Sequence, residues 1–479
     1  MKPPRPCRGR WHEATALLSK DDLDLIHSQS IEILERIEVG VRSEEASKLL
    51  VDSGAEIDED HGTVQIPATL VEQTLKNAPK EITLYGRNPK HDIRLEGGQV
   101  HFGLGMNTQQ VLDLETGERR RSTKEDVGSM VRLADALPNI DFVMPLCSAL
   151  DKPEKAQDRH ELDALLNNTE KPIICWAEDS RALIRMAAVA AGGDEVLRKR
   201  PIVSMCAHTA SPLQHDRKYV ENLLEFARAA VPAVYGPCIQ MGATRPATIA
   251  GSLAQANAEV LSGLVIAQLT KTGAPFIYGS MGSTLDQYTC LMSYGAPELA
   301  LFNAGATDLA LHYGLPHFGT GGCTDSKVVD GQAMVEATQT ALLAALCGTH
   351  LVHDIGYIES GLTASYEMMV VNDETAGMVK RILAGGVVSH ETISLETIEK
   401  VGPRGSFLTD PHTLKHLGQH FRTTLMDRRR FDAWKKDGAK DLVVRAREKA
   451  RSLLARHQPH PLPSDVFVAI RAMAETDPQ

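Results

Sequence analysis

One stretch of this sequence, from residue 350 to residue 367, holds an unusual density of side chains that could take part in chemistry. It places a histidine, an aspartate, two tyrosines and two glutamates within fifteen residues: His353, Asp354, Tyr357, Glu359, Tyr366 and Glu367. Aromatic residues make up only 5% of the chain, so paired tyrosines here are informative. Ring faces and carboxylates together suit a desolvated cation. The stretch therefore predicts a pocket for a cationic substrate.

The two histidines of this stretch have a spacing that argues against a metal site. His350 and His353 are three residues apart. In a strand, side chains at that spacing point to opposite faces, so both cannot bind one metal ion without a break in the strand. We expect no zinc site here. A buried histidine with a purely structural role is the alternative interpretation for either residue.

Two glycine-rich segments are further candidates for ligand binding. The first runs from Tyr278 to Ser283 and is followed by Tyr288 and Tyr294; a plain flexible loop explains it equally well. The second, from residue 319 to residue 327, contains Gly319, Gly321, Gly322 and Ser326 and leads after Asp330 into a predicted helix. A helix N-terminus beside such a loop favours an anionic group or a large flat ligand. Its spacing matches no strict phosphate-binding template.

The elements that position these residues alternate between short apolar strands and helices. Predicted strands cover residues 141–145, 172–176, 202–206, 233–236, 276–279, 317–319 and 351–354. Predicted helices follow them at 161–168, 182–191, 218–229, 250–270, 297–312, 332–346 and 364–383. This rhythm predicts an α/β fold, a (β/α)₈ barrel of the TIM type, with its active site at the carboxyl ends of the strands. The remaining strand is either the region of Phe102 or the segment Gly386–Val388.

The pattern divides the chain into four parts. Residues 1–19 are expected to be a flexible N-terminus, 20–130 a helical and small β elaboration, 131–400 the barrel, and 401–479 a C-terminal helical extension that packs on the barrel. Residues 421–456 hold twelve Lys or Arg against five Asp or Glu. A solvated pair of helices explains this basic block, and a docking face for an acidic partner is the alternative.

Composition narrows the class of protein. The net charge of −11 argues against a nucleic acid or an anionic membrane as partner. No secretory signal follows the basic, proline-rich N-terminus, and the longest apolar segment, 246–270, is interrupted by Gln255, Asn257 and Glu259. The eight cysteines include no C-x-x-C pair. These features predict a reduced, cytoplasmic protein.

Several long ordered motifs carry a resemblance to a known family. They are residues 112–120, Thr324–Lys327 with Asp330 and Gln332, Gly356 and the run 359–367, and the tail 401–410 with His412 and Thr413. On these the chain resembles the trimethylamine methyltransferase family along residues 20–470. The resemblance implies a barrel enzyme that moves a methyl group from a methylated amine to the Co(I) of a corrinoid protein, with no bound metal or nucleotide of its own. Archaeal trimethylamine enzymes of the family carry a pyrrolysine. Every residue here is a standard one, so the chain is similar to the branch that demethylates quaternary amines such as glycine betaine.

The resemblance also implies roles for the candidate residues. His353 and Glu359 would be catalytic, and Tyr278, Tyr357, Tyr366 and Glu367 would bind the substrate. Gly319, Gly321, Gly322 and Ser326 would face the corrinoid (cobalamin) of the partner protein. We expect a homo-oligomer. A barrel lyase or hydrolase on the same scaffold, and a non-catalytic binder of quaternary amines, are the alternative functions.

Overall fold

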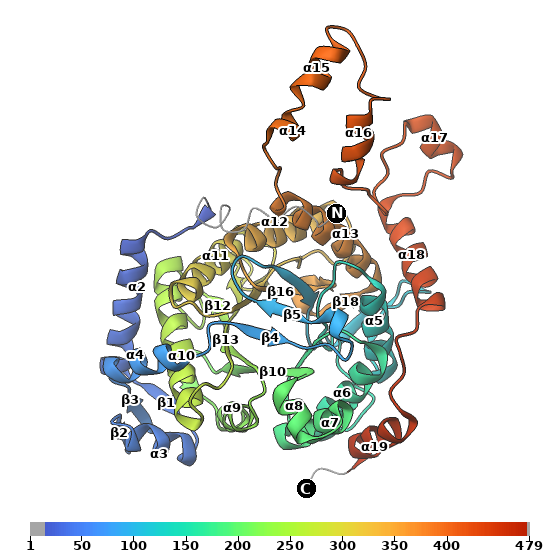
Figure 1. The fold of residues 1–479 in the computed structure, drawn as a ribbon. Coiled ribbons are helices and arrows are strands. Elements are labelled where there is room, and N and C mark those ends of the chain that lie inside the picture. The colour runs from blue at the N-terminus through green and yellow to red at the C-terminus, as the bar shows by residue number, and fades with distance from the viewer. Residues whose placement is uncertain (1–14, 477–479) are drawn as a thin grey trace.

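A closed barrel of parallel strands forms the centre of the computed structural model, which describes residues 15–476 (Figure 1). Seven strands pair in the order β6–β16–β15–β13–β12–β10–β9. Bridges between Gly103 and Phe142 and between Val143 and Ile173 place residues 142–143 between β6 and β9 and close the ring. The predicted (β/α)₈ barrel is confirmed. Its strands are β6 (His101–Leu104), residues 142–143, β9 (Ile173–Cys175), β10 (Val203–Thr209), β12 (Ala233–Met241), β13 (Phe276–Leu285), β15 (His317–Thr320) and β16 (Leu351–Ile355).

The strand whose position was open is the first one in the chain. β6 contains Phe102 and pairs in parallel with β16, Phe102 lying opposite Val352. The alternative, Gly386–Val388, lies after the last barrel helix and belongs to no strand. The barrel therefore begins inside the segment 20–130 that was expected to precede it.

Each barrel strand is followed by a helix that covers it: α5 (Lys124–Ala136), α6 (Gln157–Asn168), α7 (Ser180–Ala191), α9 (Arg217–Ala229), α10 (Ile249–Thr270), α11 (Pro297–His312), α12 (Gly331–Cys347) and α13 (Tyr366–Leu383). The helix starts follow the sequence: Thr123 and Asp126 form a capping box for α5, and Asp330 caps α12. Within residues 15–476, α10 is the one helix long and apolar enough to cross a membrane, and 72% of its most apolar window is buried inside the protein.

The segment before the barrel covers one flank and the amino end of the strands. α2 (Lys20–Glu32), the π-helix η1 (Ile33–Ile37), α3 (Glu44–Asp52) and α4 (Ala68–Asn77) pack against α10, and a small sheet of β1 (Val39–Val41), β2 (Glu56–Asp58), β3 (Thr63–Gln65) and β11 (Gln214–His215) joins them. The hairpin β4 (Ile82–Leu84) and β5 (Ile93–Leu95), with η2 (Pro89–His91), lies across the barrel in Figure 1. Arg200, just before β10, pairs with Asp92 at 2.9 Å, so this hairpin covers the amino ends of the strands. Residues 1–14 of the expected flexible N-terminus lie outside the described residues.

The chain after α13 divides into a projecting part and a packed part (Figure 1). α14 (His390–Ile393), α15 (Leu395–Val401), α16 (Pro411–His416), η5 (Leu417–Gln419) and α17 (Phe431–Lys436) extend away from the barrel. α18 (Leu442–Arg456) then packs on α13 and α5, and α19 (Ser464–Glu475) packs on α6 and α7. The C-terminal extension therefore contacts the barrel through α18 and α19, whereas most of residues 386–424 project away from it and only the end of that range, at Gln419 and Thr424, is hydrogen-bonded to α13.

Candidate active site

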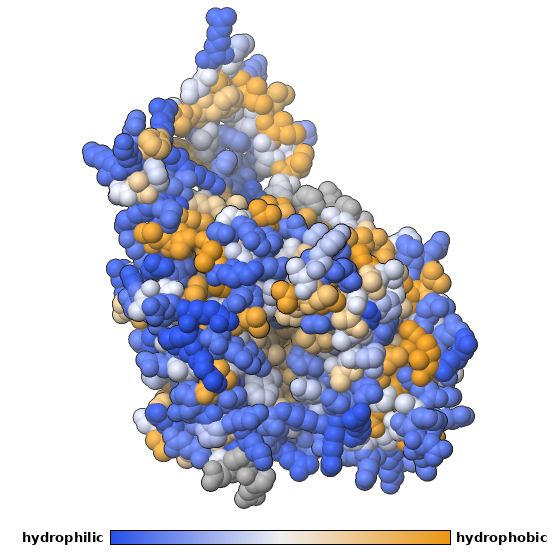
Figure 2. All heavy atoms as spheres, turned by 180° about the vertical axis from the view of Figure 1, so that it is seen from behind, coloured by the Kyte–Doolittle hydropathy of each residue, from blue (hydrophilic) through white to orange (hydrophobic). Residues whose placement is uncertain are grey.

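The carboxyl ends of the strands form a hollow on the face opposite the β4–β5 hairpin. This face is turned toward the viewer in Figure 2, and its surface is hollowed near the centre. Short elements in the loops that follow the strands surround this hollow: β7 (Gln110–Leu112), β8 (Arg119–Arg121), β14 (Met292–Ser293), β17 (Tyr357–Ile358), η4 (Glu359–Gly361) and β18 (Thr363–Ser365). The short helix α8 (Asp194–Lys199) lies at the other end of the barrel. In a barrel of this kind the active site lies at this end.

Asp354, at the end of β16, is a buried acid with one oxygen left without a partner. The residue is 1% exposed, and Oδ2 makes no close hydrogen bond, although the hydroxyl of Thr320 lies near enough to act on the pKa of the carboxyl. Burial raises the pKa of the carboxyl to about 8, because a charge in this apolar surrounding is poorly solvated. The residue also has a φ of 85°, in the left-handed region that few non-glycine residues adopt. An unsatisfied acid on a strained backbone marks a binding or catalytic position.

His353 is the hydrogen-bond partner of the other Asp354 oxygen. Its Nδ1 lies 2.8 Å from the carbonyl oxygen of Gly319 and must donate to it, and its ring stacks on Phe318 with centroids 4.1 Å apart. Burial lowers the pKa of His353 to about 3, so the ring is neutral and Nε2 has a free lone pair. Nε2 lies 3.1 Å from Oδ1 of Asp354. In the free enzyme, before any charged substrate binds, the protonated carboxyl of Asp354 therefore donates to Nε2 of His353.

Two tyrosines lie beside Asp354. The Tyr294 and Tyr357 ring centroids are 6.2 Å apart, and the pKa of each phenol is raised first by burial and next by the charge of Asp354. Tyr357 donates to the carbonyl oxygen of Met106. A Cβ on Gly105 would lie 2.3 Å from the Tyr357 ring, so glycine is required there. These contacts fix two π faces next to a carboxyl group.

Asp325 holds the loops that carry the tyrosines. Its carboxylate accepts hydrogen bonds from the backbone N–H of Tyr294 at 2.6 Å and from the hydroxyl of Ser360 at 2.8 Å, and a third from Ser293. It thus ties β14 and the residue that follows it to η4. Because Tyr357 immediately precedes η4, the contact keeps the tyrosine pair together.

Sulfur atoms line another side of the same region. The Cys238 side chain, on β12, is exposed although burial raises the pKa of its thiol, with the charge of Asp354 as the next cause. Solvent therefore reaches the thiol through the hollow. Met281, opposite Cys238 in the β12–β13 register, lies 3.6 Å from the sulfur of Cys206. Polarisable, uncharged sulfur suits contact with methyl groups.

A buried ion pair anchors the loops after β10 and β12. Arg245 and Glu259 have fully buried side chains 3.2 Å apart. Glu259 also accepts from the hydroxyl of Ser211 at 2.8 Å and from the backbone N–H of Leu213 at 3.1 Å. Removing one partner of such a pair leaves an uncompensated buried charge, so this contact stabilises the neighbouring loops.

The structure places three of the predicted site residues away from Asp354. Tyr278 on β13 points outward, and its hydroxyl donates to Oδ1 of Asn257 on α10 at 3.1 Å. Glu359 forms an ion pair with Arg119 at 2.8 Å, and Glu367 forms one with Arg447 of α18 at 2.8 Å. These contacts give all three side chains partners other than Asp354.

The other predicted residues divide between the pocket and its surroundings. His353 and Tyr357 lie at Asp354, as described above. Tyr366 is buried at the start of α13, and burial first and the charge of Asp126 next raise the pKa of its phenol. It therefore lies beside the N-terminus of α5 rather than beside Asp354.

The predicted corrinoid-facing glycines are packed against the protein itself. A Cβ on Gly319 would lie 2.0 Å from Asn303, one on Gly321 2.8 Å from Val352, and one on Gly322 2.6 Å from Ile355. The hydroxyl of Ser326 donates to Asp330 at 3.0 Å. The glycines allow α11, α12 and β16 to approach closely, and these four residues do not form an open cradle for a flat ligand. Within residues 15–476, no group of three or more His, Cys, Asp or Glu side chains is arranged to hold a metal ion.

The pocket also contains residues that the sequence did not single out as its members. Asp354, Tyr294, Cys238 and Asp325 are the important additions. Asp354 and Tyr294 lie in segments already noted for their composition. For Asp354, its position at the end of a predicted strand was a signal of a site residue that the sequence offered. Asp325 lies in the noted segment 319–327 but was not given a role there, and nothing in the local sequence marks Cys238.

The fold and the site together define a barrel enzyme with a buried carboxyl group and paired tyrosines at the mouth. The family model described as trimethylamine methyltransferase (MTTB) matches residues 6–476. The chain belongs to this family and is a methyltransferase.

Relatives and a solved structure agree with this assignment. The chain is 36% identical over 463 residues to the trimethylamine methyltransferase MttB of Desulfitobacterium hafniense (strain DSM 10664 / DCB-2), covering 95% of this chain and 93% of that protein. It is 31% identical over 462 residues to the glycine betaine methyltransferase of D. hafniense (strain Y51), covering 95% and 96%. The crystal structure of the monomethylamine methyltransferase MtmB of Methanosarcina barkeri has a TM-score of 0.51 at 12% identity, covering 91% of this chain and 87% of that one, which shows a shared fold.

Proposed function

We propose that this chain removes a methyl group from a quaternary methylated ammonium, of the glycine betaine type, and delivers it to the Co(I) of a corrinoid protein. The observation that supports this most is the orphaned oxygen of Asp354 near the paired rings of Tyr294 and Tyr357. A permanent cation would supply the partner that this oxygen lacks. A relative named as a glycine betaine methyltransferase and others named as trimethylamine methyltransferases support the substrate class.

The chain's own residues have few tasks in this reaction. As the bond between nitrogen and the methyl carbon breaks, its electron pair stays on nitrogen, and a neutral tertiary amine leaves. No proton has to be supplied, so the reaction needs no general acid. The corrinoid, a second substrate carried by the partner, supplies the nucleophile. The chain binds, orients and dehydrates the cation.

Asp354 would change protonation state when the substrate binds. The carboxyl is neutral in the free enzyme because burial holds its pKa at about 8. A cation next to it stabilises the carboxylate and lowers that pKa, so the proton is released. The Tyr294 and Tyr357 faces add cation–π attraction, and Cys238 and Met281 contact the methyl groups.

A substrate panel tests the proposal. The protein is mixed with a reduced corrinoid protein and with glycine betaine, other quaternary amines or trimethylamine, and methylation is followed from the cobalt absorption spectrum. We expect transfer from a quaternary amine. Binding of these amines without transfer under proven Co(I) conditions would instead indicate a non-catalytic binder. Consumption of substrate without any corrinoid would indicate a lyase or hydrolase.

A further inference from the structure

Residues 386–424, here called the arm, form an ordered projection without a core. Nine large apolar side chains of the arm are at least 43% exposed: Val387, Val388, Ile393, Leu395, Ile398, Phe407, Leu408, Leu414 and Leu417. The only buried residue among 386–424 is Asp410, a polar one. Figure 2 shows apolar side chains along this projection. Segments with this much uncovered apolar surface are interaction sites in soluble proteins.

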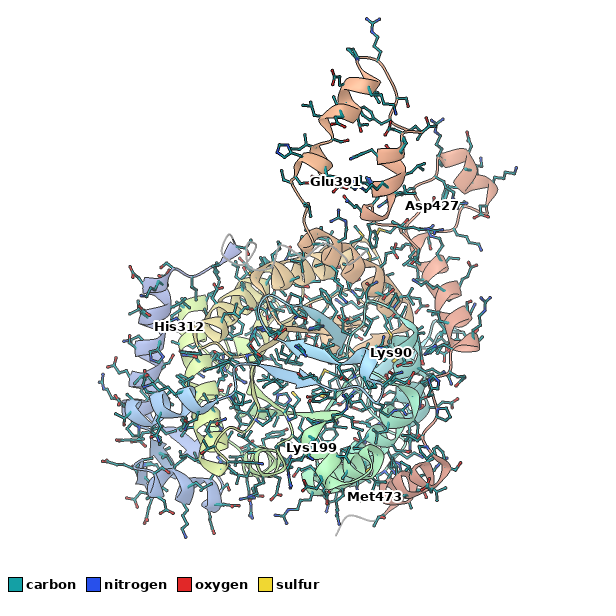
Figure 3. All side chains as sticks on the ribbon, viewed as in Figure 1. Lys90, Lys199, His312, Glu391, Asp427 and Met473 are labelled. Atoms are coloured by element: carbon teal, nitrogen blue, oxygen red, sulfur yellow. The ribbon has the colours of Figure 1, made fainter. Side chains whose placement is uncertain are left out.

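The arm has a defined shape that local polar contacts maintain. Ser389 and Thr392 form a capping box at the start of α14, and Asp410 caps α16. Lys400 pairs with Asp410 at 3.0 Å, and Lys415 pairs with Glu391, which Figure 3 labels between α14 and α16. The apolar side chains are therefore presented by a preformed scaffold, which lowers the entropy that binding must overcome.

The arm lies far from the mouth of the barrel. It follows α13, which runs antiparallel to the strands. Near the end of this helix Lys380 pairs with Asp141 at 2.7 Å, directly before the barrel strand at 142–143. The arm thus leaves the barrel at the amino ends of the strands. A partner that must reach Asp354 approaches from the other end.

The charge of the arm separates it from the rest of the chain. It holds four Lys or Arg and four Asp or Glu, so its formal charge is zero, whereas the whole chain carries −11. Two copies of this anionic protein repel each other over most of their surface. The neutral arm is a surface on which they can meet without that repulsion.

We infer that the arm is the interface on which a second copy of this chain docks. A stable interface buries about 800 Å² on each partner, and nine half-exposed or more exposed apolar side chains supply surface of that order. An apolar, charge-balanced surface can pair with the same surface of another copy across a two-fold axis. The inference does not depend on the proposed substrate or acceptor.

Sedimentation velocity with the purified full chain, without substrate or corrinoid protein, tests the inference. We expect the wild type to sediment above the 52.2 kDa of one chain at micromolar concentration. The double variant Leu395→Lys/Leu408→Lys should dissociate with a Kd at least ~100-fold higher, because it places charges in an apolar interface. The matched control Leu25→Lys/Val468→Lys changes two similarly exposed residues on α2 and α19 and should assemble like the wild type.

Several results would overturn the inference. They are a wild type that stays monomeric at every concentration, an arm variant that still assembles, and a control variant that dissociates equally. A monomeric wild type whose binding to the corrinoid protein is lost in the arm variant would assign the arm to that partner instead. Hydrogen exchange on the wild type provides a readout without substitution: amides of residues 390–419 should become less protected as the protein is diluted.

Discussion

Asp354 and Glu161 are two buried acids near the carboxyl end of the barrel, and they differ in the partners of their oxygens. Both residues are 1% exposed, and burial raises the pKa of each to about 8. The Glu161 carboxyl accepts from the backbone N–H of Ala149 at 3.0 Å and from the indole N–H of Trp176 at 2.7 Å. Oδ2 of Asp354 has no partner. A raised pKa alone therefore does not mark the site; at Asp354 the raised pKa coincides with an unmet oxygen at the carboxyl end of a barrel strand.

The two acids should respond very differently to loss of charge. Asp354→Asn should lower kcat/KM for methyl transfer by ~100-fold or more, because the cation would lose its counter-charge in a desolvated site. Asparagine tolerates a positive φ, so the backbone at this position should be preserved. Glu161→Gln, the matched control, should change kcat/KM by less than ~3-fold, because the proposed cation contacts Asp354 and not Glu161. The amide oxygen keeps one of the two donors, Ala149 N–H or the Trp176 indole N–H, and the other then faces the amide nitrogen. Steady-state kinetics of both variants test the contrast, and equal losses would contradict it.

The pH dependence of substrate affinity should also come from Asp354 and not from Glu161. Substrate binding favours the carboxylate, whereas protons favour the neutral acid of the free enzyme. Affinity should therefore fall as pH falls below about 8, by roughly tenfold per pH unit. Calorimetry in buffers of different ionisation enthalpy at pH 7 should detect the release of about one proton per substrate bound.

The same two variants show which acid causes the pH dependence. Glu161→Gln should keep the pH dependence and the proton release, and Asp354→Asn should lose both. A wild-type Kd that stays constant between pH 6 and pH 8 would show that Asp354 does not exchange its proton for the substrate.

Sequence reasoning located the elements well, for a physical reason. Parallel strands buried on both faces are short apolar runs, and the helices between them carry capping residues such as Thr123 and Asp330, so both kinds of element are legible. The same burial on both faces removes the alternation that distinguishes inward from outward side chains. For that reason Tyr278, which points to α10, could not be separated in advance from residues that point into the barrel.

Partners distant in sequence account for the other differences. Glu359 is neutralised by Arg119 and Glu367 by Arg447, and no local pattern reveals these pairs. A glycine that admits a ligand and one that admits a neighbouring helix look alike in sequence, as Gly319, Gly321 and Gly322 show. The segment His353–Asp354 could be found because its position at a strand end is itself a sequence feature.

Cysteine accessibility offers a second test of which side chains line the hollow. Cys238 and Cys290 are both exposed, but Cys238 lies on β12 near Asp354 and Cys290 lies in the loop between β13 and β14. A saturating quaternary amine should slow alkylation of Cys238 by about tenfold, because the bound ligand occupies the space in front of the thiol. Alkylation of Cys290 should proceed at an unchanged rate. Peptide mass spectrometry measures both rates in one sample, and equal protection of the two thiols would contradict the placement.

The smallest expected effect on substrate affinity comes from substituting a tyrosine beside Asp354. Tyr294→Phe keeps the ring and should leave substrate affinity within about 2-fold of the wild type. Tyr294→Leu removes the π face and should weaken binding by ~3- to 30-fold, the range of a cation–π contact of about 0.5–2 kcal/mol. A neutral isostere of the substrate, with carbon in place of the quaternary nitrogen, should bind both variants alike. Titration calorimetry with the two ligands separates cation recognition from general packing. If Tyr294→Leu weakened the binding of both ligands equally, the ring would contribute by its shape alone. Asp354 would then be the group that recognises the charge of the substrate.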